Sequence, residues 1–285
     1  MGMWKESYAV GHELIDSQHM ELFRMTDDLV DVLRRQEADS RDACARALVF
    51  LKEYVVKHFA DEEALQAKLG YEGLAAHCLL HRDFVATVAE YERKLIESRF
   101  DLQIVQQFTG KLIGWLIYHV VREDGKITGM VSADAAPAYS DAVPFIACFS
   151  DSASEVLSQM LSTAVAVSDE TPTSVSGQND INVSVGVIGD RPGSAEFVFP
   201  LVTALRIVQS MTMAPVDGFG DMVESALREI ANIISGNAAS RIASAGYACD
   251  ITPPRLYRGL RPIPSDGKVM QSDLGSLAIF WQKGD

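Results

Sequence analysis

Residues 58–81, HFADEEALQAKLGYEGLAAHCLLH, decide the fold of the first half of the chain. The stretch has the apolar spacing of two helices joined by a tight turn, yet its expected inner faces carry polar side chains. His58 and Glu62 are four residues apart, as are His77 and His81, so each pair lies on one face of a helix. Burying such groups without bonding partners is unfavourable. The segment therefore predicts that something inside the protein is bound to these side chains.

Apolar positions recur at alternating steps of three and four residues in four segments before residue 120, which is the period of amphipathic helices. The four seams are Ile15, His19, Leu22, Thr26, Leu29 and Leu33; Cys44, Leu48, Leu51, Val55, His58, Glu62 and Leu65; Leu74, His77, His81, Phe84, Val88, Tyr91 and Leu95; and Val105, Phe108, Leu112, Trp115 and His119. Gly70 stands where a glycine commonly ends a helix. Four such helices with short connections predict an up-down-up-down bundle.

The polar residues of these seams fall at matching depths, because the starts of odd helices and the ends of even helices meet at one end of an antiparallel bundle. The residues brought together in this way are His19, His58, Glu62, His77, His81 and His119. Asp124 follows His119 by five residues, so it lies off the seam of a straight helix but can turn inward where the helix ends. His12 precedes the first seam, and we expect Glu63 to be a solvated surface residue.

A single histidine on an apolar face is usually a hydrogen-bonded core residue. Five histidines and a glutamate in one buried layer need another explanation, since unpaired buried groups cost about 1–3 kcal/mol each. With Asp124, the imidazole and carboxylate groups exceed the four ligands of a tetrahedral zinc ion. The set suits two first-row metal ions that share carboxylate bridges.

Composition limits the classes of function. The net charge is −14, which disfavours nucleic-acid binding. The longest apolar run, Leu112 to Val121, is shorter than a membrane span and contains His119. The first residues lack the pattern of a secretory signal, and four scattered cysteines suit a reducing compartment. We therefore expect a cytoplasmic protein that binds neither membranes nor nucleic acid.

The chain of 285 residues is long enough for two domains. All six histidines precede residue 120, and the small, polar stretch MVSADAAPAYSD follows soon after. We expect a bundle domain at residues 1–130, a linker at 131–141 and a second domain at 142–285.

The second domain mixes strand and helix patterns. Alternating residues predict two strands around the turn GDRPG, the first through Val183, Val185 and Val187 and the second through Ala195, Phe197 and Phe199. Helices are expected at 142–165, 201–212 and 217–245, and a strand in the final DLGSLAIFW. The predicted class of this domain is α+β.

The expected helix 217–245 has two different faces. Its apolar residues gather on one side, and Ser225, Glu229, Asn232 and Gly236 share the opposite side. Two interpretations stay open: an ordinary solvated surface, or a docking face on which Gly236 leaves room for a partner's backbone.

Four segments of the first domain, IDSQHMELF, HFADEE, GYEGLAAHCLLH and WLIYHVVRED, resemble the hemerythrin family, bacteriohemerythrins in particular. The resemblance implies a non-haem centre of two iron ions, oxo- or hydroxo-bridged, with O2 as its reversible ligand. It implies that the first iron is held by His77, His81 and His119, the second by His19 and His58, and that Glu62 and Asp124 bridge the pair. Gly125, directly after Asp124, departs from the family pattern and is expected to loosen the helix end.

The second domain resembles the chemotaxis phosphatase family of CheC, CheX and FliY, through VSVGVIGDRPGSAEFVFP and SALREIANIISGNAASRIASAGYACDITPP. The residues that carry the family signature are Ser225, Glu229 and Asn232, with Pro253 or Pro254 downstream. A single Glu/Asn motif is present, as in CheX. The resemblance further implies a homodimer.

This second resemblance implies hydrolysis of the aspartyl phosphate of a CheY-like response regulator, which supplies its own Mg²⁺ and lysine. A carboxamide can hold the attacking water in line without acting as a base. Asn232 would be that group, and Glu229 would pair with the regulator's lysine.

The leading hypothesis is an oxygen- or redox-sensing di-iron protein that dephosphorylates a CheY-like regulator. The alternative is an oxygen-binding or storage hemerythrin whose CheX-like domain is catalytically silent and only docks. A di-iron oxidase or peroxidase is disfavoured, because oxygen-activating bundles use carboxylate-rich ligation.

Overall fold

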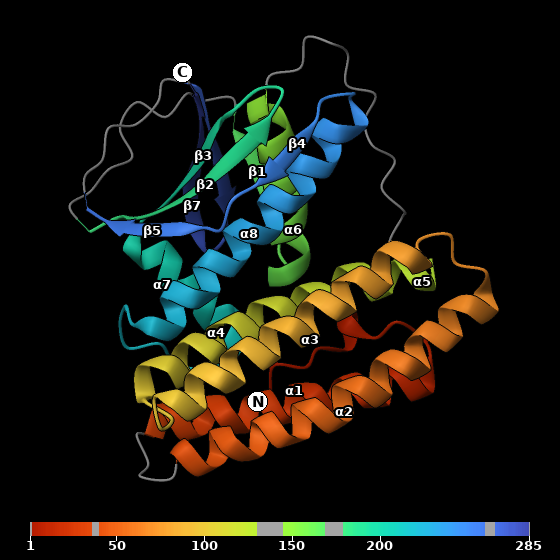
Figure 1. Cartoon of the computed structure of the whole chain (residues 1–285). Helices are drawn as coiled ribbons and strands as arrows, with labels where there is room; N and C mark the ends of the chain where they lie inside the picture. Colours follow the sequence, from red (N-terminus) through yellow and green to blue (C-terminus); the bar gives the residue numbers. More distant parts are fainter. Residues whose placement is uncertain (1, 36–39, 130–144, 169–178, 260–265, 285) are drawn as a thin grey trace. The chain divides into compact units, whose positions relative to one another are not determined.

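Figure 1 shows the computed structural model of the chain, which describes residues 2–35, 40–129, 145–168, 179–259 and 266–284. The chain divides into two compact units, which lie mainly before and after residue 133. The predicted linker at 131–141 and the first three residues of the predicted second domain lie outside the described residues. The limits of the two domains therefore stay predictions.

The first unit is a four-helix bundle. Its helices are α1 (Glu13–Arg35), α2 (Ser40–Leu69), α3 (Leu74–Glu97) and α4 (Leu102–Tyr118), preceded by the short helix η1 (Glu6–Tyr8). Each helix packs against the next, and α1 also packs against α4. Lys52 Nζ lies 2.8 Å from Glu92 Oε1, whereas Glu63, later in α2, bonds to His81, earlier in α3. The two helices are thus antiparallel, and the predicted up-down bundle is confirmed.

The predicted seams form the core of this bundle. Leu22, Leu51, Phe84 and Leu112 are each at most 3% exposed, one from each helix. The apolar period alone positions these residues, because each helix must bury a single stripe against its neighbours. Toward the end of α2 the buried position moves from the predicted Leu65, which is half-buried, to Gln66, which is fully buried.

The fourth helix does not simply end after Tyr118. It begins after the capping residue Asp101, whose side chain accepts a hydrogen bond from the backbone N–H of Gln103. It then continues as the π-helical segment η2 (His119–Asp124) and the short helix α5 (Gly125–Ile127). Gly125 has helical backbone angles, φ −58° and ψ −26°, so the chain stays helical where we expected it to loosen.

The second unit is built on an antiparallel sheet. Its strands are β1 (Ala166–Ser168), β2 (Ile181–Gly189), β3 (Gly193–Phe199), β4 (Cys249–Ile251), β5 (Arg255–Arg258), β6 (Asp266–Ser272) and β7 (Gly275–Lys283). Their order is β1-β6-β7-β3-β2-β4, and β5 also pairs with β2. In this register Val183 lies opposite Phe197, which in turn lies opposite Ile279, so one apolar face runs across the middle strands.

Three helices complete the second unit: α6 (Phe145–Leu161), α7 (Leu201–Thr212) and α8 (Asp221–Ser244). In Figure 1, α6 and α8 lie side by side against the sheet, with α6 packed on β6 and β7 and α8 on β2 and β4. The ring of Phe149 in α6 lies 6.5 Å from Phe197 and 5.8 Å from Trp281. The α+β class is confirmed.

Some predicted elements of this unit differ from the structure. The helix expected at 142–165 ends at Leu161, because Ser162 takes the left-handed conformation with φ 54°. The helix expected at 217–245 spans 221–244. Strands β1, β4, β5 and β6 were not predicted, since each is short or lacks regular alternation. No helix among the described residues combines the length and the apolar composition that a membrane crossing needs.

Candidate metal centre and docking helix

The seven predicted metal ligands lie together inside the bundle. Each is at most 2% exposed, and they comprise His19 from α1, His58 and Glu62 from α2, His77 and His81 from α3, and His119 and Asp124 from η2. Candidate ligand atoms form two groups, His19–His58–Glu62 and Glu62–His77–His81–His119, and within each group they lie within 4.8 Å of one another. Glu62 belongs to both groups. The predicted layer is therefore one cluster with two halves.

The carboxylate of Glu62 faces histidines of both halves. Its Oε1 is 2.8 Å from His77 Nε2. Its Oε2 is 3.6 Å from His58 Nε2 and 3.5 Å from His81 Nε2. A carboxylate in this position can bridge two cations.

Asp124 has the same double orientation. Its Oδ2 is 3.1 Å from His19 Nε2, while its Oδ1 is 3.3 Å from His77 Nε2 and 3.2 Å from His119 Nε2. Hydrogen bonds of a π-helix join residues five apart, so the π-helical η2 lets both His119 and Asp124 point into the bundle. The helix widens rather than ending, which is how Asp124 turns inward.

Two histidines are oriented by partners outside the cluster. His58 Nδ1 lies 3.0 Å from Gln18 Oε1, and Gln18 Nε2 donates to Asp61 Oδ2 at 2.7 Å, which fixes the orientation of the amide. His81 Nδ1 lies 2.9 Å from Glu63 Oε1. Both partners present only acceptor oxygens to the rings, so each Nδ1 carries the hydrogen and donates it. In the neutral ring the Nε2 lone pair then faces the cluster.

Sequence reasoning missed these outer partners. The expectation that Glu63 is merely solvated is wrong: its side chain is 37% exposed and accepts a hydrogen bond from His81. Gln66 is fully buried and donates from Nε2 to Glu62 Oε1 at 2.7 Å. Its position four residues after Glu62 is a usable signal. Gln18 lies three residues after Ile15 and four before Leu22, so the helical period places it on the buried face, but that period does not reveal its bond to His58.

Burial and the facing charges shift the pKa values of the cluster in different directions. Burial lowers the pKa of His58 to about 4 and that of His119 to about 3, so both rings are neutral at pH 7. Burial also opposes charge on His77, but the carboxylates of Asp124 and Glu62 outweigh it and raise the pKa of His77 to about 10. Burial alone would raise the pKa of both carboxyl groups, yet the facing histidines bring that of Glu62 to about 2 and that of Asp124 well below its ordinary value.

The inward atoms lack hydrogen-bond partners, which tests whether metal ions fit. Among the described residues, none bonds to the buried His19 Nε2, His77 Nε2, Glu62 Oε2 or either carboxylate oxygen of Asp124. The separations are short, but the directions do not meet those of an N–H···O bond. These atoms converge without satisfying one another, as ligands of a common ion do.

The contact between His81 and His119 also fits a bound metal ion. Their Nε2 atoms face each other at 3.1 Å, and two neutral rings cannot both donate across such a contact. Two imidazole nitrogens held about 2.1 Å from one ion at a right angle would be about 3.0 Å apart. The donor set therefore fits bound cations.

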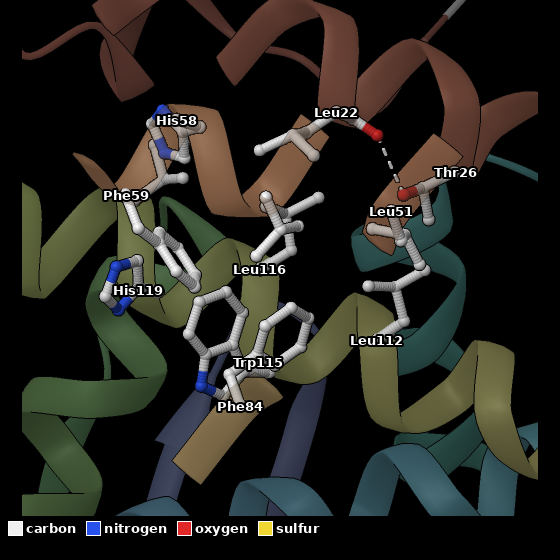
Figure 2. Close-up of a pocket in the computed structure, with 12 residues that line it drawn as sticks. Leu22, Thr26, Leu51, His58, Phe59, Phe84, Leu112, Trp115, Leu116 and His119 are labelled. Atoms are coloured by element: carbon white, nitrogen blue, oxygen red, sulfur yellow. Dashed lines mark hydrogen bonds between the residues drawn. The ribbon is translucent and has the colours of Figure 1, made fainter. Parts of the chain in front are cut away.

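A small apolar cavity adjoins the cluster. It measures about 10 Å³, near the size that holds one water molecule. Figure 2 shows His58 and His119 at one side and aliphatic side chains, Leu51 and Leu112 among them, at the other. The one hydroxyl in its lining, that of Thr26, donates to the backbone oxygen of Leu22 at 2.9 Å. The cavity can therefore take a small apolar molecule but offers little to a polar one.

Aromatic rings fix two of the ligand rings. Phe59 stacks on His81, with centroids 3.7 Å apart and planes 4° apart. Trp115 stacks on His119 at 4.2 Å and on Phe84 at 3.7 Å. These contacts limit ring rotation and exclude water from this side of the cluster.

The candidate docking residues lie on α8. Asn232 and Gly236 are half-buried, whereas Ser225 is 8% exposed and Glu229 only 3%. The face is therefore not the open, solvated surface that one interpretation required. Pro253 and Pro254 lie between β4 and β5.

The two units are similar to two different families of known proteins. Residues 10–131 match the model of the hemerythrin HHE cation-binding domain. Bacteriohemerythrin of Clostridium acetobutylicum is 30% identical over 125 residues, which is 44% of this chain and 96% of that protein. Myohemerythrin of Riftia pachyptila is 31% identical over 127 residues, 45% of this chain and 91% of that protein.

Residues 181–266 match the model of the chemotaxis phosphatase CheX. The crystal structure of CheX from Vibrio vulnificus covers 53% of this chain and 100% of its own, at 22% identity and a TM-score of 0.44. A CheX–CheY–BeF3–Mg²⁺ complex from Borrelia burgdorferi covers 50% and 99%, at 26% identity and a TM-score of 0.43. The chain thus belongs to the hemerythrin family through its first half and carries a domain of the CheX chemotaxis phosphatase family in its second.

Proposed function

We propose that this protein is an oxygen- or redox-responsive di-iron protein that dephosphorylates a CheY-like response regulator. The observation that carries the proposal is the buried cluster of five histidines and two carboxylates, divided into two halves that share Glu62 and Asp124, on the same chain as a CheX domain. A hemerythrin domain implies iron binding, and the shared carboxylates favour two ions over one.

In this proposal His77, His81 and His119 hold one iron, and His19 and His58 hold the other. Glu62 and Asp124 bridge them, since each carboxylate faces both halves. When bound, the iron pair supplies a reversible, oxidation-dependent site for O2. Five histidines against two carboxylates favour such binding over the carboxylate-rich chemistry of oxidases.

The protein's own residues shape that site. The half with three histidines is closed by the stacked Phe59 and Trp115. The half with two histidines has one protein ligand fewer and would leave a position for an added ligand, and the apolar cavity lined by His58 and His119 is near the size of one small molecule. An apolar cavity of this kind favours O2 over water and ions.

For the phosphatase reaction, Asn232 would orient the water that attacks the phosphorus of the regulator's aspartyl phosphate. The bond from phosphorus to the aspartate oxygen breaks, and inorganic phosphate leaves. Glu229 would pair with the regulator's lysine, while the regulator supplies Mg²⁺. We further propose a homodimer in the cytoplasm, in keeping with the family resemblance and with four free cysteines.

A phosphatase assay tests the proposal. The decay of a phosphorylated regulator is followed with the reduced and the oxidised protein, and with Asn232→Ala. Loss of a water-positioning group is expected to slow decay about 100-fold, whereas Ser244→Ala, at an exposed polar residue that ends the same helix, should not change it. Equal decay with Asn232→Ala and the parent protein would reject the catalytic role. Equal rates in both redox states would reject only the regulation.

The alternative, an oxygen-binding hemerythrin with a silent docking domain, is favoured by one observation. Glu229 is 3% exposed, so it must be uncovered before it can reach a partner's lysine. The same assay separates the two functions: unassisted decay in every redox state, with binding of the regulator retained in a pull-down, supports the alternative.

A further inference from the structure

Two ligand candidates of the cluster are held from outside by groups of different charge. His58 Nδ1 donates to the neutral amide oxygen of Gln18 at 3.0 Å. His81 Nδ1 donates to the carboxylate of Glu63 at 2.9 Å. The two halves of the cluster therefore have unlike outer surroundings, although their inner ligands are of the same chemical types.

The orientation of the neutral Gln18 amide is fixed by a second hydrogen bond. Gln18 is 4% exposed, and its Nε2 donates to Asp61 Oδ2 at 2.7 Å. A flipped amide would place its NH2 group against the ring nitrogen and its oxygen against a carboxylate, so that orientation is excluded. Gln18 thus orients His58 without bringing a formal charge to its ring.

The carboxylate of Glu63 acts differently on the ring of His81. A carboxylate draws the Nδ1 hydrogen more strongly than an amide does, which increases the electron density at Nε2 and makes the imidazole a stronger ligand. The stacked ring of Phe59, 3.7 Å from His81, keeps the imidazole in the plane that meets Glu63. Among the described residues, no comparable acceptor bonds to Nδ1 of His19 or His77.

We infer that Glu63 is a positioning residue that makes the half with His77, His81 and His119 the more electron-rich half of the centre. This inference rests on the proposed di-iron function. A more electron-rich ligand set stabilises the oxidised form of a bound metal, so Glu63 lowers the reduction potential of this half. Gln18, being neutral, leaves the other half easier to reduce. Glu63 thereby sets which oxidation level the sensor prefers.

The test compares Glu63→Gln with the full-length parent protein. The variant keeps an acceptor oxygen of the same shape but removes the charge. Outer partners of metal-bound histidines typically change affinity or activity 10–100-fold. We expect a change of about tenfold in the oxidised-to-reduced ratio, a rise of about 59 mV for one electron. Spectroelectrochemical titration measures it, and iron retention against a chelator is the second readout.

Two further variants keep a structural effect apart from a charge effect. Glu53→Gln removes the same charge from an exposed position on the same helix and should leave the potential unchanged. Glu63→Ala removes the acceptor as well, and we expect it to weaken iron retention about 10–100-fold, whereas Glu63→Gln retains iron nearly as the parent does.

The outcomes distinguish this inference from the proposed function. Parent protein that binds no iron overturns both. Parent protein with a di-iron spectrum, together with a Glu63→Gln potential equal to that of Glu53→Gln, overturns the role of Glu63 alone. A raised potential in Glu63→Gln only, with iron retained, supports it.

Discussion

Removal of iron should destabilise the bundle far more than the second unit. Five buried inward atoms would lose their ligation, and they belong to His19, His77, Glu62 and Asp124. An unsatisfied buried polar group costs about 1–3 kcal/mol. Even at the lower end the loss is about 5 kcal/mol, comparable to the total stability of a small domain, about 5–15 kcal/mol. The metal-free bundle should therefore be marginally stable.

Hydrogen exchange followed by mass spectrometry measures this in the full chain, because peptides report on each helix and strand. After reduction and chelation, amides of α2 and α3 near the cluster should exchange orders of magnitude faster than in the iron-loaded protein. A loss of about 5 kcal/mol corresponds to a protection decrease of more than 1,000-fold. Peptides of β2, β3 and β7 should change little.

Equal protection of the bundle helices with and without iron would show that the metal does not stabilise the bundle. His12→Ala provides a matched control: His12 Nδ1 is also buried and without a hydrogen bond among the described residues, but it lies outside the cluster. That variant should retain both its iron and the difference between loaded and metal-free protein. Iron loss in His12→Ala would mean that His12 also contributes to metal binding.

Three further outcomes follow from the geometry. Leu116→Ala should enlarge the cavity beside His58 and lower the free energy of unfolding by about 2–5 kcal/mol in denaturant titrations, with faster release of O2; unchanged release would show that ligands do not use this cavity. Gln66→Leu removes the donor to Glu62, so iron retention against a chelator should fall about tenfold; full retention would make the amide dispensable. Cys44 is fully buried, and burial raises its pKa to about 12, whereas the half-buried Cys78, although burial and Glu63 raise its pKa too, is accessible to reagent; iodoacetamide at pH 8 should therefore modify Cys78 and leave Cys44 intact in peptide maps, and equal labelling would contradict this.

The bundle was predictable from sequence because one physical requirement dominates it. Each helix must bury one stripe, and the stripe repeats with the helical period. His19, His58, His77 and His81 occupy positions on those stripes, so their burial follows from the same rule that buries Leu22 and Phe84. In an antiparallel bundle, their places along the four helices then put these histidines at one depth.

The outer partners were not predictable in this way. Gln18 is 4% exposed because its spacing from Ile15 and Leu22 places it on the buried face of α1, but its bond to His58 depends on how α1 and α2 approach each other. Glu63 is on the flank of α2, and only the approach of α3 makes it a partner of His81. Hydrogen bonds between helices depend on their rotation and separation, and a period in the sequence fixes neither quantity to within a bond length.

The second unit shows the corresponding limit for strands. β2 and β3 alternate over enough residues to be recognised, and their register confirms the pairing of Val183 with Phe197. By contrast, β4 and β5 have only three and four residues. Both pair with β2, at different parts of its length, so their conformation is set by an edge that exists only after β2 has folded.

The position of Asp124 shows that the α-helical period alone does not identify every residue of the cluster. Five residues of a straight α-helix turn the side chain by about 140° relative to His119, which would place a carboxylate away from the cluster. The π-helical η2 removes this difference, and Asp124 then contacts His19 and His119, which come from different halves of the cluster. Such segments are rare and frequently mark functional sites. A local departure from ideal geometry is what joins two sets of histidines into one centre, and a helical period alone cannot predict it.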